Sequence, residues 1–139
     1  MLKFLEGLLG KSDTGKWGEK EAARHLRRKG YYILGERVRL DRRDELDLVA
    51  RDGEVLVFVE VKTRRSEGVF GRPSDAVNRK KRRVISRAAV RYLKRLEKKP
   101  QYIRFDVVEV IGSISEGVMD LRHIENAFSL SYPYRFVYG

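Results

Sequence analysis

The 139-residue chain contains no cysteine, two histidines, three prolines and no long hydrophobic run. The lack of cysteine excludes disulfides, thiolate zinc sites and a cysteine nucleophile, and it fits a reducing, cytoplasmic location. The N-terminal residues MLKFLEGLLG are apolar, but Lys3 and Glu6 interrupt them. This segment is too short and too broken for a signal peptide or a membrane span, so we expect no membrane partner.

Acidic residues are scarce relative to basic ones. The chain has 20 Asp and Glu against 31 Lys and Arg, which gives a formal net charge of +11 and a pI near 10.1. A surplus of this size on a small protein favours a polyanionic partner, and nucleic acid is the first candidate. Charge alone leaves open a soluble basic protein without such a partner.

The length and the 42% hydrophobic content predict a single domain over 14–139, preceded by a short apolar segment over 1–13. Hydrophobic periodicity predicts two helices and five strands, with a bend in the first strand at Gly35. Their order, αβββαββ, predicts an α/β sandwich with a mixed central sheet. The expected helices cover 14–29 and 74–98, and the expected strands cover 31–39, 45–50, 54–62, 102–111 and 117–124.

The clearest local signal is a β-hairpin around Asp52-Gly53, because an Asp-Gly pair between two apolar runs favours a tight turn. If these two residues form the turn, Glu45 faces Glu60. Side chains alternate between the faces of a strand, so one face is expected to carry three acids and a lysine. These are Glu45, Asp47, Glu60 and Lys62, and the opposite, apolar face carries Leu46, Leu48, Ala50, Val55, Val57, Val59 and Val61.

This charged face has two interpretations. Like charges opposite one another destabilise a sheet, and a divalent cation such as Mg²⁺ or Mn²⁺ would relieve the repulsion between the carboxylates. The alternative is a solvent-exposed face on which Lys62 forms an ion pair with Glu60 or Asp47, which is common on half-exposed strands. The hairpin pattern favours both interpretations equally.

The stretch ELDLVARDGEVLVFVEVKTR resembles the core of the PD-(D/E)XK nuclease superfamily. Glu60-Val61-Lys62 stands as its E-x-K motif and Asp47 as its metal-binding aspartate. With GEKEAARHLRRKGYYIL before it and RFDVVEV after the long helix, the chain is similar to the uncharacterised YraN-like branch, which is related to Holliday-junction resolvases of the Hjc type. The resemblance spans residues 17–128 and implies a restriction-endonuclease-like fold.

The resemblance also implies a function, a metal-dependent endonuclease that cleaves DNA, with structured or branched DNA as the expected substrate. Asp47, Glu60 and the backbone carbonyl of Val61 would hold Mg²⁺ or Mn²⁺, and Lys62 would orient the nucleophile or stabilise the transition state. Glu19 matches the helix acid of the superfamily, which implies a catalytic role in binding water or a second ion. A glutamate in a first helical turn is also favoured by the helix dipole alone.

The sequence departs from this resemblance in two places. The YraN-like branch usually carries Gly-Glu where this chain has Asp44-Glu45, and the extra carboxylate is expected either to weaken the approach of phosphate or to point to solvent. The proline of the superfamily's name is replaced by Leu46. The lone histidines, His25 and His123, have no matching serine or cysteine and favour structural roles.

Basic residues after the E-x-K motif and along the long helix are the expected nucleic-acid contacts. Two alternatives to a DNA nuclease remain open, a nucleic-acid-binding protein with little or no catalysis and an RNA-directed nuclease, since no aromatic stacking platform indicates a preference. Related resolvases act as homodimers, so the resemblance also implies a homodimer for this chain. The expected phosphate contacts are Arg64, Arg65, Lys80, Arg83, Arg87 and Arg91.

Overall fold

The computed structural model describes residues 13–65 and 77–134, and these form two helices and five strands in the predicted order αβββαββ. Most of the predicted apolar N-terminal segment lies outside the described residues. The elements are α2 (Asp13–Arg28), β1 (Tyr32–Arg39), β2 (Glu45–Asp52), β3 (Val55–Arg64), α3 (Arg79–Arg95), β4 (Tyr102–Ser113) and β5 (Gly117–Phe128).

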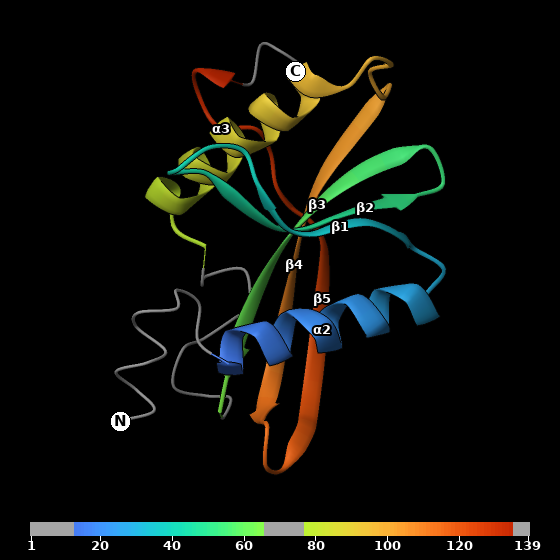
Figure 1. Cartoon of the computed structure of the whole chain (residues 1–139), viewed down its shortest axis with the longest axis vertical. Coiled ribbons are helices and arrows are strands. Elements are labelled where there is room, and N and C mark those ends of the chain that lie inside the picture. The colour runs from blue at the N-terminus through green and yellow to red at the C-terminus, as the bar shows by residue number, and fades with distance from the viewer. Residues whose placement is uncertain (1–12, 66–76, 135–139) are drawn as a thin grey trace.

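The strands form one five-stranded sheet in the order β1-β2-β3-β4-β5. Strands β3 and β4 are parallel, whereas the other neighbours are antiparallel, so the sheet is mixed as predicted. Helix α3 covers one face of the sheet and α2 covers the other, which confirms the α/β sandwich (Figure 1). Neither helix in the described part of the chain is long and apolar enough to cross a membrane.

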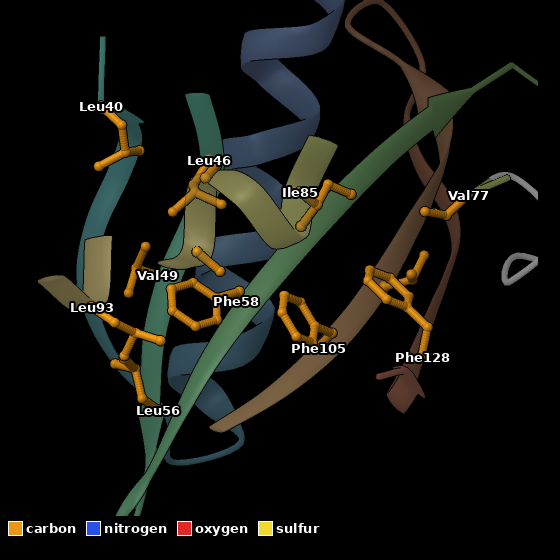
Figure 2. Close-up of a cluster of buried hydrophobic side chains, with 13 residues drawn as sticks. Leu40, Leu46, Val49, Leu56, Phe58, Val77, Ile85, Leu93, Phe105 and Phe128 are labelled. Carbon is orange, nitrogen blue, oxygen red and sulfur yellow. The ribbon is translucent and has the colours of Figure 1, made fainter. Parts of the chain in front are cut away.

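The core under α3 is aromatic. Phe58 stacks on Phe105, and Phe105 stacks on Phe128, with ring centroids 5.5 and 5.0 Å apart. Ile85 and Leu93 of α3 pack on this row (Figure 2). Each of these buried side chains contributes about 2 kcal/mol through removal of apolar surface from water.

The core under α2 is built from smaller side chains. Ala22, Ala23 and Leu26 of α2 pack on Val57 and Val59 of β3, on the opposite face from Phe58. The helix also lies very close to β3 near its own N-terminus. A Cβ atom built on Gly18 would lie 1.9 Å from Oγ1 of Thr63, so only glycine fits here. This contact fixes the first half of α2 above the residue that follows Lys62.

Helix α3 is shorter than the predicted 74–98 range. It begins at Arg79, because Asn78 has an extended backbone and its side chain accepts a hydrogen bond of 2.9 Å from the Lys81 N–H, as an N-cap does. The helix ends at Arg95, and Leu96 returns to an extended conformation. Ser74 and Asp75, with which the predicted helix begins and which the sequence favours as its caps, lie outside the described residues.

The hairpin turn is displaced from its predicted position. Asp52 pairs with Val55, so Gly53 and the next residue form the turn, and Gly53 has a φ of +60°. A glycine with positive φ at the first central position is typical of the primed turns of hairpins, which explains why the turn begins at Gly53 and not at Asp52. Asp52 stays on its strand, where it accepts a hydrogen bond of 3.1 Å from Nη1 of Arg104.

Candidate active site

The displaced turn changes which acidic residues meet. The observed register of β2 and β3 is shifted by two residues from the predicted one, and it is paired as far as Leu48 and Val59. Continuing it by one residue places Asp47, and not Glu45, beside Glu60. A shift of two residues leaves the side chains of the paired residues on their predicted faces, whereas a shift of one would have exchanged the faces.

The carboxyl groups of Asp47 and Glu60 therefore form a pair, and both residues are buried to about 9% exposure. Oδ2 of Asp47 accepts a hydrogen bond of 2.9 Å from the backbone N–H of Val61. Burial first, and then the negative charge of Asp47, raise the pKa of Glu60 to about 8. At neutral pH the pair holds a proton that an exposed pair of acids would have lost.

The prediction of three acids at this site is wrong for Glu45. It pairs with Arg39 of the neighbouring strand in the β1–β2 register, and its Oε2 lies 3.6 Å from Nε of Arg39. Leu46 was expected on the face of Leu48, but it packs in the cluster under α3. Both differences occur where the β2–β3 pairing ends, which is the point at which strict alternation no longer holds.

Two lysines flank the carboxylate pair. Lys62 follows Glu60 by two residues on β3 and is half-buried. Lys81, on the first turn of α3, places Nζ 3.9 Å from Oε1 of Glu60. The positive charge of Lys81 lowers the pKa of Glu60 more than that of Lys62 does, although neither offsets burial and Asp47. Lys81 was missed in the sequence because the strand pattern gives no information on which helix residue faces the hairpin.

Glu19 lies on α2 and is buried to 2% exposure. Its Oε1 is 3.8 Å from Nε of Arg37, a residue of β1 that adopts the left-handed conformation with a φ of +50°. The contact of Gly18 with Thr63 places Glu19 near the same end of β3 as Lys62. Its predicted catalytic role stays a prediction, because the structure gives it a charged partner outside the Asp47–Glu60 pair.

The donor chemistry of the pair suits a hard divalent cation, since two carboxylates in a low-dielectric site repel each other until a cation is bound. Within residues 13–65 and 77–134, however, no three acidic, histidine or cysteine side chains are grouped for metal binding. Asp47 and Glu60 would therefore hold an ion together with backbone and water oxygens, as Mg²⁺ sites commonly do.

A second charged group lies beyond the lysines on the same face. Nε of Arg64 lies 2.9 Å from Oε2 of Glu109, and Nη1 of Arg122 lies 3.8 Å from Oε1 of the same carboxylate. Glu109 is buried to 2% exposure and is opposite Lys62 in the β3–β4 register. Arg64, an expected phosphate contact, is thus held in place by a buried acid.

The expected phosphate contacts on α3 divide into two groups. Arg87 forms an ion pair of 2.6 Å with Asp44, and Arg91 lies 3.0 Å from the same carboxylate. Asp44 is buried, so the expectation that it points to solvent is wrong, whereas its expected effect on the approach of phosphate stays a prediction. Lys80 and Arg83, in contrast, are exposed on the first turns of the helix, and Arg65 is exposed after β3.

Another buried carboxylate, Asp106, was missed in the sequence. Nε2 of His123 lies 2.8 Å from its Oδ2, Nε of Arg104 donates to Oδ1 at 2.9 Å, and the Asn126 N–H donates to Oδ1 at 3.0 Å. Burial raises the pKa of Asp106, but the hydrogen bonds from His123 and Arg104 outweigh it, and the pKa is lowered. His123 thus has the structural role expected for a lone histidine.

The signal that could have identified Asp106 and Glu109 is the one that identified Glu60. Both residues interrupt the apolar strand of residues 105–111, as Glu60 interrupts β3. A charge inside such a strand indicates a buried polar contact. The sequence does not reveal whether the contact is a structural ion pair or a site for a ligand, because the partners come from distant elements.

The fold and these residues define an α/β-sandwich protein with a buried carboxylate pair between two lysines. A family model described as the uncharacterised protein family UPF0102 matches residues 18–110, and the chain belongs to this family. This confirms the YraN-like resemblance. The matched range includes Glu19, Asp47, Glu60, Lys62 and Lys81.

Curated relatives carry the same family name. A UPF0102 protein of Caldicellulosiruptor saccharolyticus is 41% identical over 120 residues, which cover 86% of this chain and all of the relative. A relative in Symbiobacterium thermophilum is 48% identical over 115 residues, covering 83% of this chain and 95% of its own length. One in Chlorobaculum tepidum is 46% identical, covering 82% and 90% of the two chains.

Proposed function

We propose that this protein is a metal-dependent endonuclease of the PD-(D/E)XK type that hydrolyses phosphodiester bonds in DNA, with structured or branched DNA as its substrate. The observation that carries the proposal is the buried pair of Asp47 and Glu60. A stable protein gains nothing from two adjacent buried acids without full compensation, whereas a metal-dependent hydrolase requires them. The E-x-K spacing of Glu60 and Lys62 supports the same function.

Each residue of the site has a role in the proposed reaction. Asp47 and Glu60, with the carbonyl of Val61, bind Mg²⁺ or Mn²⁺. The ion, when bound, lowers the pKa of a water molecule and stabilises charge on phosphate oxygens. Lys62 positions the attacking water or stabilises the developing charge, which its half-buried location on the same face as Glu60 allows.

The surface around the site supports nucleic acid as the substrate. The first turns of α3 carry the exposed Lys80 and Arg83, and a hollow of about 440 Å³ at this end of the helix is lined by Arg79, Arg82 and Arg83 together with residues 128–132. Together with the net charge of +11, these groups provide a basic approach to the carboxylate pair. Arg87 and Arg91 contribute less to this surface because Asp44 neutralises part of their charge.

The proposal is tested by incubating the protein with labelled duplex, flap, single-stranded and four-way-junction DNA, and with matched RNA, in Mg²⁺ or Mn²⁺. We expect metal-dependent cleavage of at least one DNA substrate. Asp47→Asn, Glu60→Gln and Lys62→Met should each lower the rate at least about 100-fold while retaining the metal-free affinity for DNA, measured in EDTA. Glu54→Gln is a matched control, since Glu54 is an exposed acid on the same hairpin and should leave the rate unchanged.

A second function, nucleic-acid binding without catalysis, is favoured by one observation. The described residues offer no third acid grouped with Asp47 and Glu60, and one oxygen of Asp47 is already hydrogen-bonded to the backbone. If the wild-type protein binds DNA but cleaves no substrate with any metal ion, this function replaces the first. Metal titration by calorimetry, comparing wild type with Asp47→Asn, distinguishes a site that binds a metal ion from a site that no longer binds one.

A further inference from the structure

The first turn of α3 brings a lysine into contact with the candidate site. The N-cap hydrogen bond from the Lys81 N–H to Asn78 fixes the backbone at Lys81, and its Nζ lies 3.9 Å from Oε1 of Glu60. The side chain of Lys81 is 44% exposed, whereas that of Glu60 is 10% exposed. The ammonium group therefore lies on the solvent side of the carboxylate, between Glu60 and the direction from which a nucleic acid would approach.

Other cations of α3 have structural partners. Arg87 and Arg91 bind Asp44, Nε of Arg82 donates to the carbonyl of Val77 at 2.8 Å, and Arg95 donates to the carbonyl of Leu40. These contacts tie the helix to its surroundings. The contact of Lys81 differs, because its partner is Glu60. Glu60 would release the Lys81 ammonium group when it binds a metal ion.

We propose that Lys81 is a phosphate-binding residue of this site that exchanges Glu60 for a phosphate oxygen of the nucleic acid when a divalent cation binds Asp47 and Glu60. The inference rests on the proposed function for the identity of the ligand. It adds a residue outside the E-x-K motif and a mechanism that couples the metal to the substrate.

The exchange follows from charge and reach. A divalent cation bound to Glu60 would lie within a few ångströms of the Lys81 ammonium group, and the two positive charges would repel each other. A lysine has a flexible four-carbon stem and a compact charge, so it can turn to a new anion without movement of the helix. The anion that arrives with the metal is the phosphate. Metal and nucleic acid then increase each other's affinity, as linkage requires.

The test is the affinity of the full-length protein for a fluorescein-labelled four-way-junction DNA, measured by anisotropy with EDTA and with Ca²⁺ over a series of salt concentrations. We expect Ca²⁺ to tighten binding by wild type. In Lys81→Met, binding in EDTA should equal that of wild type, whereas most of the gain from Ca²⁺ should be lost. The slope of log K against log[salt] in Ca²⁺ should decrease in magnitude by about one, as for the loss of one phosphate contact.

Two variants serve as controls. Lys80→Met removes an exposed neighbouring cation and should weaken binding by the same factor with and without Ca²⁺. Lys81→Arg keeps the charge and should retain most of the Ca²⁺-dependent gain. A thermal unfolding curve for each variant reports whether the fold is intact, and Lys81→Gln, which also removes the charge, replaces Lys81→Met if that variant is unstable.

The inference is overturned if Ca²⁺ does not tighten binding by wild type, or if Lys81→Met keeps the full gain. Its outcome is independent of the nuclease assay. A protein that shows the coupling but cleaves nothing retains Lys81 as a phosphate-binding residue and loses the proposed catalysis. A protein that cleaves DNA, but whose Lys81→Met variant keeps the full gain, retains the catalysis and loses the inference.

Discussion

Two buried carboxylate centres lie on opposite faces of the same sheet, and the protein compensates them very differently. Asp106, on the face of α2, is bound by His123, Arg104 and a backbone N–H, and its pKa is lowered. Glu60, on the face of α3, has another acid as its neighbour and a lysine, Lys81, at 3.9 Å that does not offset burial, and its pKa is raised to about 8.

The comparison indicates which centre stabilises the fold. The hydrogen bonds to Asp106 of β4 come from β5 and from Tyr31, which follows α2. The ionised carboxylate of Asp106 therefore stabilises the folded protein. When both acids are ionised, the pair of Asp47 and Glu60 costs stability unless a cation is bound. A buried acidic site that destabilises the folded protein and is surrounded by basic residues is typical of a functional site.

Removal of the well-compensated carboxylate should have the largest effect. Asp106→Ala leaves Arg104 and His123 partly buried without their anion, and we expect a loss of about 3 to 5 kcal/mol in the free energy of unfolding, measured by urea denaturation. Asp106→Asn, which keeps the shape, should lose less. A loss below about 1 kcal/mol for Asp106→Ala would remove the distinction between the two centres.

The stability of the metal-free protein should fall as the pH rises from about 4.5 to about 8. Glu60 is an acid whose pKa in the folded protein is raised from 4.5 to about 8, so the folded protein binds the proton more tightly than the unfolded chain over this window. The stabilisation is complete below the lower pKa and is lost as pH passes the upper one, a change on the order of 5 kcal/mol.

Unfolding in EDTA over this pH range, for wild type and Glu60→Gln, measures the contribution of Glu60. The variant has no ionisable group at this position, and it should be more stable than wild type at pH 8. Addition of Mg²⁺ should reduce the fall in the wild type, because a bound cation stabilises the ionised pair. Parallel pH curves for wild type and variant would contradict the raised pKa.

The close approach of α2 to β3 allows a smaller perturbation next to the site. Gly18→Ala introduces a Cβ atom within 1.9 Å of Oγ1 of Thr63, so the helix must shift away from the strand. We expect a cost of about 1 to 3 kcal/mol in the free energy of unfolding, as for other overpacked positions. Gly30→Ala is a control without a steric clash, since open space surrounds Gly30, although its φ of +95° adds backbone strain.

The smallest effects should separate binding from structure within α3. Arg83→Ala removes an exposed cation, so it should weaken DNA binding by about 1 kcal/mol or less and leave stability unchanged. Arg87→Ala leaves the buried Asp44 with one partner fewer and should mainly lower stability, measured by urea denaturation. Equal effects of both variants on DNA affinity and on stability would contradict this division of the helix.

The sequence predicted the fold because local patterns carried most of the information. Strands with period two, helices with period 3.6 and a glycine in the hairpin turn were sufficient for the order αβββαββ and the mixed sheet. The limits of α3 were less well predicted, because Asn78 and not an earlier polar residue caps the helix. Several polar residues were candidates, and the choice among them depended on the packing of Val77 and Ile85 into the core.

By itself, the sequence determined that Asp47, Glu60 and Lys62 share a face opposite Val57, Val59 and Val61. Alternation is a property of every strand, so this result survived the error of two residues in the register. The tertiary structure alone decided that Asp47 meets Glu60 while Glu45 binds Arg39, that Asp44 is neutralised by α3, and that Lys81 reaches the site. Such contacts join elements far apart in the chain, and they depend on the docking of helices on the sheet, which no local pattern specifies.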